Sequence, residues 1–83
     1  MIHETVLSSS YATPERACRV ERSIVPEIGD IDDDRSSTRL ERDGDELTVT
    51  VEASDLVALR AAINTWLTLL AVAEDVDSVP ASE

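Results

Sequence analysis

A long, almost uncharged segment constrains the fold of this chain more than any other feature. Residues 56–73 carry a single charge, Arg60, although 30% of the whole sequence is charged. Apolar residues recur there at the i, i+3, i+4, i+7 spacing of a helix lying on a core: Leu56, Leu59, Ile63, Trp66, Leu67 and Leu70. Ser54 suits the N-cap, and Asp55 places a carboxylate in the first turn. The sequence therefore predicts a helix over residues 55–75.

The opposite side of this predicted helix also lacks charge. It carries Val57, Ala58, Ala61, Thr65, Thr68 and Val72. Small, uncharged side chains on the back of a helix indicate a second packing surface, supplied by this chain or by another. A membrane span is disfavoured, because Arg60 and Asn64 interrupt a segment that is already at the lower limit of bilayer length.

Alternation and turn residues predict the other elements. A helix over residues 14–25 begins at the N-cap Thr13 with Pro14 in its first turn, and it ends before Pro26. Gly44 marks the turn of a hairpin. The predicted segments are a strand at 2–9, an acidic loop at 26–36, strands at 37–42 and 46–53, and an acidic tail at 77–83.

This order of elements predicts an α+β fold with two layers. A three-stranded antiparallel sheet would carry both helices on one face. The 83 residues would form a single domain whose small core benefits from oligomerisation. Neither edge strand carries a lysine or proline, so a second copy could extend the sheet.

The charge balance excludes one class of partner. Eighteen acidic residues face seven basic ones, all arginine, for a net charge of −11. Nonspecific attraction to phosphate backbones or anionic lipid is therefore not the main mode of binding. This bias is typical of proteins from a cytoplasm of molar salt, where the Debye length is about 3 Å, and it favours a haloarchaeal source. A single cysteine and an opening unlike a targeting peptide predict a cytoplasmic protein.

Catalytic and metal-binding patterns are almost absent from the sequence. His3 lies near a terminus, Cys18 lies within a predicted helix, and the chain has neither lysine nor a glycine-rich phosphate loop. We therefore expect no enzyme activity, no metal and no cofactor. The acidic run resembles a calcium loop, with Asp30, Asp32, Asp34 and Glu41 at suitable spacing. Arg35 occupies the position that requires glycine, which favours a solvated loop instead.

Two polar rows could contact a partner. Arg16, Arg19 and Arg22 follow one another at helical spacing, and could contact RNA or acidic groups. Pairing with Glu15 and Glu21 on a solvated surface is the favoured explanation. Arg60, Asn64 and Thr68 form a second row beside the apolar side of the long helix. They could set the register of a helical interface, or Arg60 could instead bond the carbonyls of the preceding loop.

Two stretches together resemble the small Pcc subunit of the KEOPS complex. The first is ATPERACRVERSIVPE, and the second is VTVEASDLVALRAAINTWLTLLAVAEDV. The most specific part is V-E-A-S-D-L-x-A-L-R-A-A-x-N-x-W-L over residues 51–67. The resemblance extends from Thr5 to Val76.

The resemblance implies a non-catalytic, homodimeric adaptor with three antiparallel strands and two helices on one face. In that family the two helices pack with two helices of the threonylcarbamoyl-transferase subunit. The assembly modifies adenosine 37 of tRNA, which this subunit would contact only indirectly. Carried onto this chain, the resemblance implies partner contacts at Val20, Ile24, Val57, Arg60, Ala61, Asn64 and Thr68.

A stand-alone nucleic-acid-binding module is the alternative from another class. Small folds with similar numbers of strands and helices bind RNA. The net charge, the missing GXXG loop and the scarcity of aromatic residues oppose this alternative.

Overall fold

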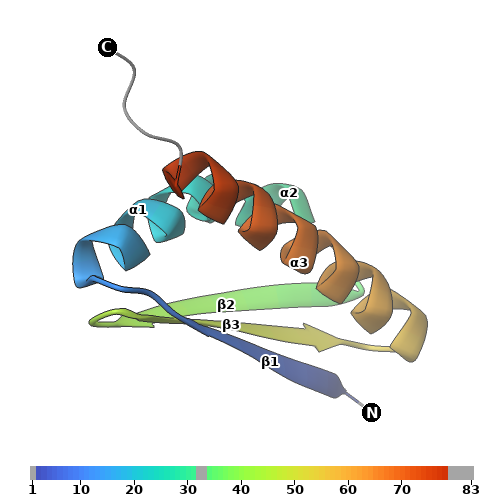
Figure 1. The fold of residues 1–83 in the computed structure, drawn as a ribbon. Helices are drawn as coiled ribbons and strands as arrows, with labels where there is room; N and C mark the ends of the chain where they lie inside the picture. The colour runs from blue at the N-terminus through green and yellow to red at the C-terminus, as the bar shows by residue number, and fades with distance from the viewer. Residues whose placement is uncertain (1, 32–33, 79–83) are drawn as a thin grey trace.

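The computed structural model describes residues 2–31 and 34–78 and confirms the predicted α+β fold. Its elements are β1(His3–Ser10), α1(Pro14–Ile24), the 3-10 helix η1(Val25–Glu27), α2(Ile28–Ile31), β2(Ser36–Asp43), β3(Glu46–Ala53) and α3(Leu56–Ser78). The strands form one antiparallel sheet, and the helices lie together on one of its faces (Figure 1). The fold therefore has two layers, and α3 spans the longer dimension of the helical layer.

β3 is the central strand, between β1 and β2. Leu7 of β1 and Leu40 of β2 both pair with Val49, so the inward-facing positions of the three strands line up. The apolar residues of β3 are at most 3% exposed: Leu47, Val49, Val51 and Ala53. Gly44 opens the two-residue β2–β3 loop with a φ of 63°, which glycine adopts without strain.

α1 begins as predicted. The Thr13 hydroxyl accepts a hydrogen bond from the Arg16 backbone N–H at 3.1 Å, and Pro14 occupies the first turn. This satisfies one of the N–H groups that a helix start leaves unpaired. Ala17, Val20 and Ile24 form the buried side of α1.

The predicted acidic loop at 26–36 is wrong over its first half, where the chain forms η1 and α2. Pro26 lies in the first turn of η1, where its fixed φ suits a helical turn and its missing N–H leaves no bond unmade. Ile28, at the start of α2, packs against the core. Asp32 and Asp33 lie outside the described residues.

Asp55, not Ser54, caps α3. Its Oδ1 accepts a hydrogen bond from the Ala58 N–H at 2.8 Å, and the Arg35 guanidinium donates to the same carboxylate at 3.0–3.2 Å. Ser54 instead donates its backbone N–H to the Arg35 carbonyl at 2.9 Å. The Arg35 side chain, followed by the Ala58 N–H, lowers the pKa of Asp55 below its usual value of 3.8. At its other end α3 continues to Ser78, three residues beyond the predicted end.

We expect Asp55→Ala to lower the urea midpoint of unfolding, and Asp55→Asn to lower it less because an amide oxygen can still cap. Because the pKa of Asp55 is lowered on folding, its stabilising effect is complete above pH 3.8. It is lost as the pH falls through the lower, folded pKa. The gap in midpoint between wild type and Asp55→Ala should therefore narrow in strong acid. A gap of constant size would contradict the assigned ion pair and cap.

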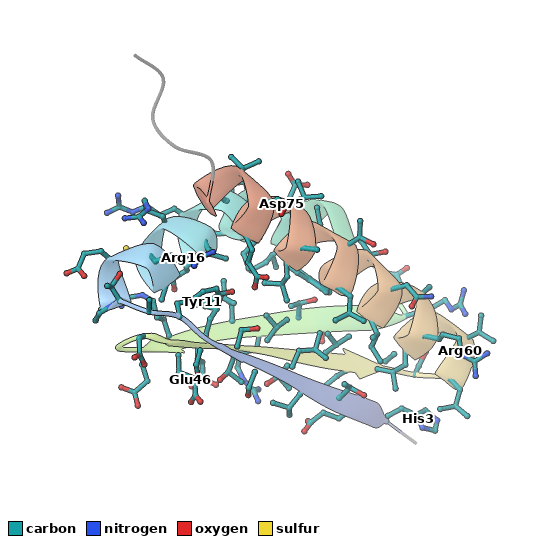
Figure 2. The ribbon with its side chains drawn as sticks, in the orientation of Figure 1. His3, Tyr11, Arg16, Glu46, Arg60 and Asp75 are labelled. Atoms are coloured by element: carbon teal, nitrogen blue, oxygen red, sulfur yellow. The ribbon has the colours of Figure 1, made fainter. Side chains whose placement is uncertain are left out.

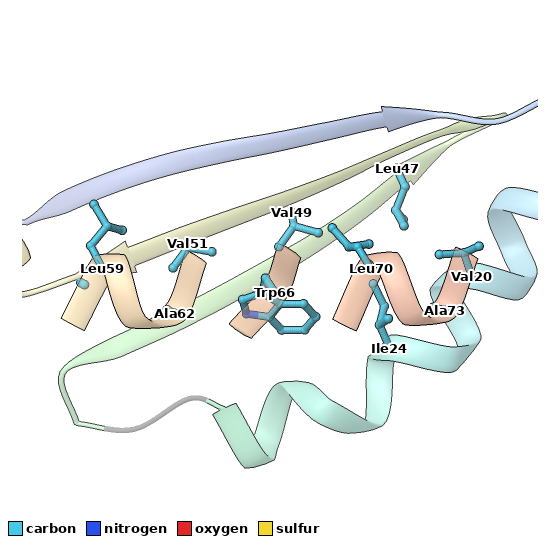
Figure 3. Close-up of a cluster of buried hydrophobic side chains, with 11 residues drawn as sticks. Val20, Ile24, Leu47, Val49, Val51, Leu59, Ala62, Trp66, Leu70 and Ala73 are labelled. Atoms are coloured by element: carbon cyan, nitrogen blue, oxygen red, sulfur yellow. The ribbon is translucent and has the colours of Figure 1, made fainter. Parts of the chain in front are cut away.

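The core lies between α3, α1 and the inner face of the sheet (Figure 3). Trp66 is fully buried at its centre, and its Nε1 donates a hydrogen bond to the Thr38 hydroxyl of β2 at 3.0 Å. Five α3 residues share this buried face: Leu59, Ala62, Trp66, Leu70 and Ala73. The indole thus fixes both the rotation and the position of α3 over the sheet.

The buried side of α3 differs in part from the predicted apolar side. Leu56 is 59% exposed and Leu67 is 50% exposed, whereas Ala62 and Ala73 are buried. Large and small apolar residues have thus exchanged their expected places, because α3 packs its alanines close to its neighbours. Two leucines are consequently left on the outer surface.

Candidate partner-binding site

The side of α3 that points away from the sheet is open to solvent. Val57 is 72% exposed, and Ala61, Asn64, Thr68 and Ala71 are also exposed. Steps of four, three, four and three residues separate these five positions, as in the 3.5-residue repeat of a helix that packs lengthwise on another. We call these five residues the α3 seam. Four of them are predicted interface residues.

The two threonines on this side of α3 have less free hydrogen-bonding capacity than the sequence suggests. The Thr65 hydroxyl donates to the Ala61 carbonyl, and the Thr68 hydroxyl donates to the Asn64 carbonyl, each at 2.9 Å. Each hydroxyl is therefore already bonded to its own helix. The sequence could not show these rotamers. In contact with a partner, such threonines cost less desolvation than free hydroxyls would.

Charges occur only towards the two ends of the exposed side of α3. Arg60 lies near the first turn and Asp75 near the last, and Figure 2 shows them at opposite ends of the helix. Between them the exposed residues are uncharged, including Val72, which is 54% exposed. A partner that covers the α3 seam would therefore desolvate few charges at its centre, which is where interfaces are usually depleted of them.

A hydrogen bond holds the C-terminal half of α3 to the rest of the fold. The Tyr11 hydroxyl donates to Glu74 Oε2 at 2.6 Å, and the Tyr11 backbone N–H donates to the Asp45 carbonyl at 2.9 Å. The Arg16 guanidinium carbon lies 5.7 Å from the centre of the Tyr11 ring. Burial, followed by the bond to Glu74, raises the pKa of Tyr11 to about 12.

We expect Tyr11→Phe to destabilise the protein by about 1 kcal/mol, the usual net value of one hydrogen bond. Because folding raises the pKa of Tyr11, its contribution is complete below pH 10.0 and is lost as the pH rises towards about 12. Urea unfolding at neutral pH and in this alkaline range tests both statements. Equal alkaline losses of stability in wild type and Tyr11→Phe would contradict the role given to this hydroxyl.

The predicted contact residues of α1 and those of α3 differ in exposure to solvent. Val20 and Ile24 are 0% and 1% exposed, so they belong to the core and not to an open surface. Their spacing suited either role, because a core face and a partner face have the same period. Val57, Arg60, Ala61, Asn64 and Thr68 remain exposed.

The three arginines of α1 do not form one exposed stripe. Arg16 is half-buried against the Tyr11 ring, whereas Arg19 and Arg22 are exposed. A row of phosphate contacts along α1 would need all three guanidinium groups on the surface. The surface of α1 therefore carries two exposed arginines and not a row of three.

No catalytic constellation is visible in residues 2–31 and 34–78. His3 lies near the start of β1, and Cys18 is a half-buried residue of α1. Within the same residues no three His, Cys, Asp or Glu side chains are placed to hold a metal ion. A hollow of about 200 Å³ lies near the start of β2, lined in part by Ile2, Arg35 and Glu52. Ligand pockets usually measure about 300–1,000 Å³.

By length and composition alone, residues Leu56–Val76 of α3 could cross a membrane. One such helix is weak evidence, because the core helix of a water-soluble fold passes the same test. Leu59, Trp66 and Leu70 pack on the sheet, as expected of a core helix. The helix passes the test because its solvent-exposed side is largely uncharged as well.

Comparisons with known proteins give one family and one shared fold. A model of the family described as "Transcription factor Pcc1" matches residues 4–76. A chain in the crystal structure of the binary complex Gon7-Pcc1 has a similar fold, with a TM-score of 0.79 and 12% sequence identity. The match covers 89% of this chain and 90% of that chain. A search of the curated proteins finds no match.

Proposed function

Because the chain belongs to the Pcc1 family, we propose that it is a non-catalytic, dimeric adaptor subunit of a KEOPS complex. In this function it holds the threonylcarbamoyl-transferase subunit of the tRNA-modifying assembly against its helical layer. The α3 seam is the observation that carries the proposal. The related fold was itself crystallised with a protein partner, Gon7.

The α3 seam suits a helical partner. Ala61 and Ala71 present only methyl groups, so a second helix could approach to the lower end of the usual 8–10 Å between helix axes. Asn64 is the one amide in the middle of the seam. In helical interfaces a single polar residue of this kind sets the register of the two helices, at some cost in affinity. Arg60 lies beside the seam, where an acidic group of the partner would complement it.

In this proposal the other subunits bind tRNA, and the charge of the chain supports that division. At a net charge of −11, this subunit alone repels a phosphate backbone. Exposed Arg19 and Arg22 are too few to reverse this repulsion. Contact with tRNA is therefore indirect in this proposal, and the chemistry belongs to the partners. The protein acts inside the cell, where that assembly works.

Co-purification in molar KCl, with mass spectrometry of the bound proteins, tests the adaptor function. We expect the transferase subunit to be recovered in stoichiometric amount with the tagged protein. High salt is needed because it screens the mutual repulsion of acidic subunits. Recovery of the protein alone, together with tight RNA binding by the purified chain, would overturn the adaptor and favour the stand-alone RNA-binding module.

A further inference from the structure

We draw no further inference here: the strongest candidate, the outward face of the sheet, where Glu4 lies opposite Glu52 and Asp43 opposite Glu46, is a cluster of acidic side chains, and nothing in residues 2–31 and 34–78 shows what covers it.

Discussion

Trp66→Ala is expected to cause a large loss of stability. The side chain is fully buried at the centre of the core, and truncation of such an aromatic residue costs about 3–5 kcal/mol. A domain of 83 residues is stable by roughly 4–12 kcal/mol in total, at about 0.05–0.15 kcal/mol per residue. The loss is aggravated because the Thr38 hydroxyl loses its indole partner. Circular dichroism and urea titration in molar KCl measure the effect.

Two variants separate the causes of this loss. Trp66→Phe retains most of the ring but not the Nε1–H, and should fall between wild type and Trp66→Ala. Val72→Ala removes methyl groups from the exposed side of the same helix, and should change stability by about 0.5 kcal/mol or less. If Trp66→Ala were no less stable than Val72→Ala, α3 would not be packed on the sheet through the indole.

Ala61→Arg is expected to abolish binding of the transferase subunit without unfolding the chain. The residue is exposed in the middle of the α3 seam, so an arginine fits the isolated subunit. In an interface it would force two helices apart and bury a charge, and we expect affinity to fall by at least about 100-fold, or about 2.7 kcal/mol. Titration of the transferase subunit into the purified variant measures this loss.

Ser37→Arg adds the same charge at an exposed position on the sheet, and should bind as the wild type does. The pair of variants therefore separates the place of the charge from the change in net charge. Wild-type affinity of Ala61→Arg would show that the partner binds elsewhere. Loss of helical signal in the same variant would show that Ala61 is needed inside the fold.

The main outline of the fold was predictable because strong periodic signals do not depend on distant contacts. The alternation of β3 and the Thr13-Pro14 start of α1 are examples. Asp55 replaced Ser54 as the cap because Arg35, twenty residues away in sequence, supports its carboxylate. The helical turns after Pro26 depend on Ile28 reaching the core, which local composition cannot indicate.

The candidate site was predictable only in part, for a related reason. Missing charge on one side of a helix correctly placed Ala61 and Thr68 on an open surface. The same pattern could not distinguish a buried face from an exposed one. Val20, predicted to contact a partner, is buried, and Leu67, predicted to face the core, is exposed. Which leucines are exposed depends on the angle at which α3 crosses the sheet. That angle is set by Trp66, Thr38 and Tyr11, which lie on three different elements or loops.

The ion pair between Glu21 and Arg42 also bears on the size that an assembly of this protein can reach. A sheet whose two edges can both pair with further strands can add copies without limit, and such open-ended growth produces fibres. Because the β2 edge is protected by its own charges, pairing between copies at a sheet edge could use only β1. The product is closed after a single step. Edge pairing between copies of this chain would therefore end at two chains and could not grow into a fibre.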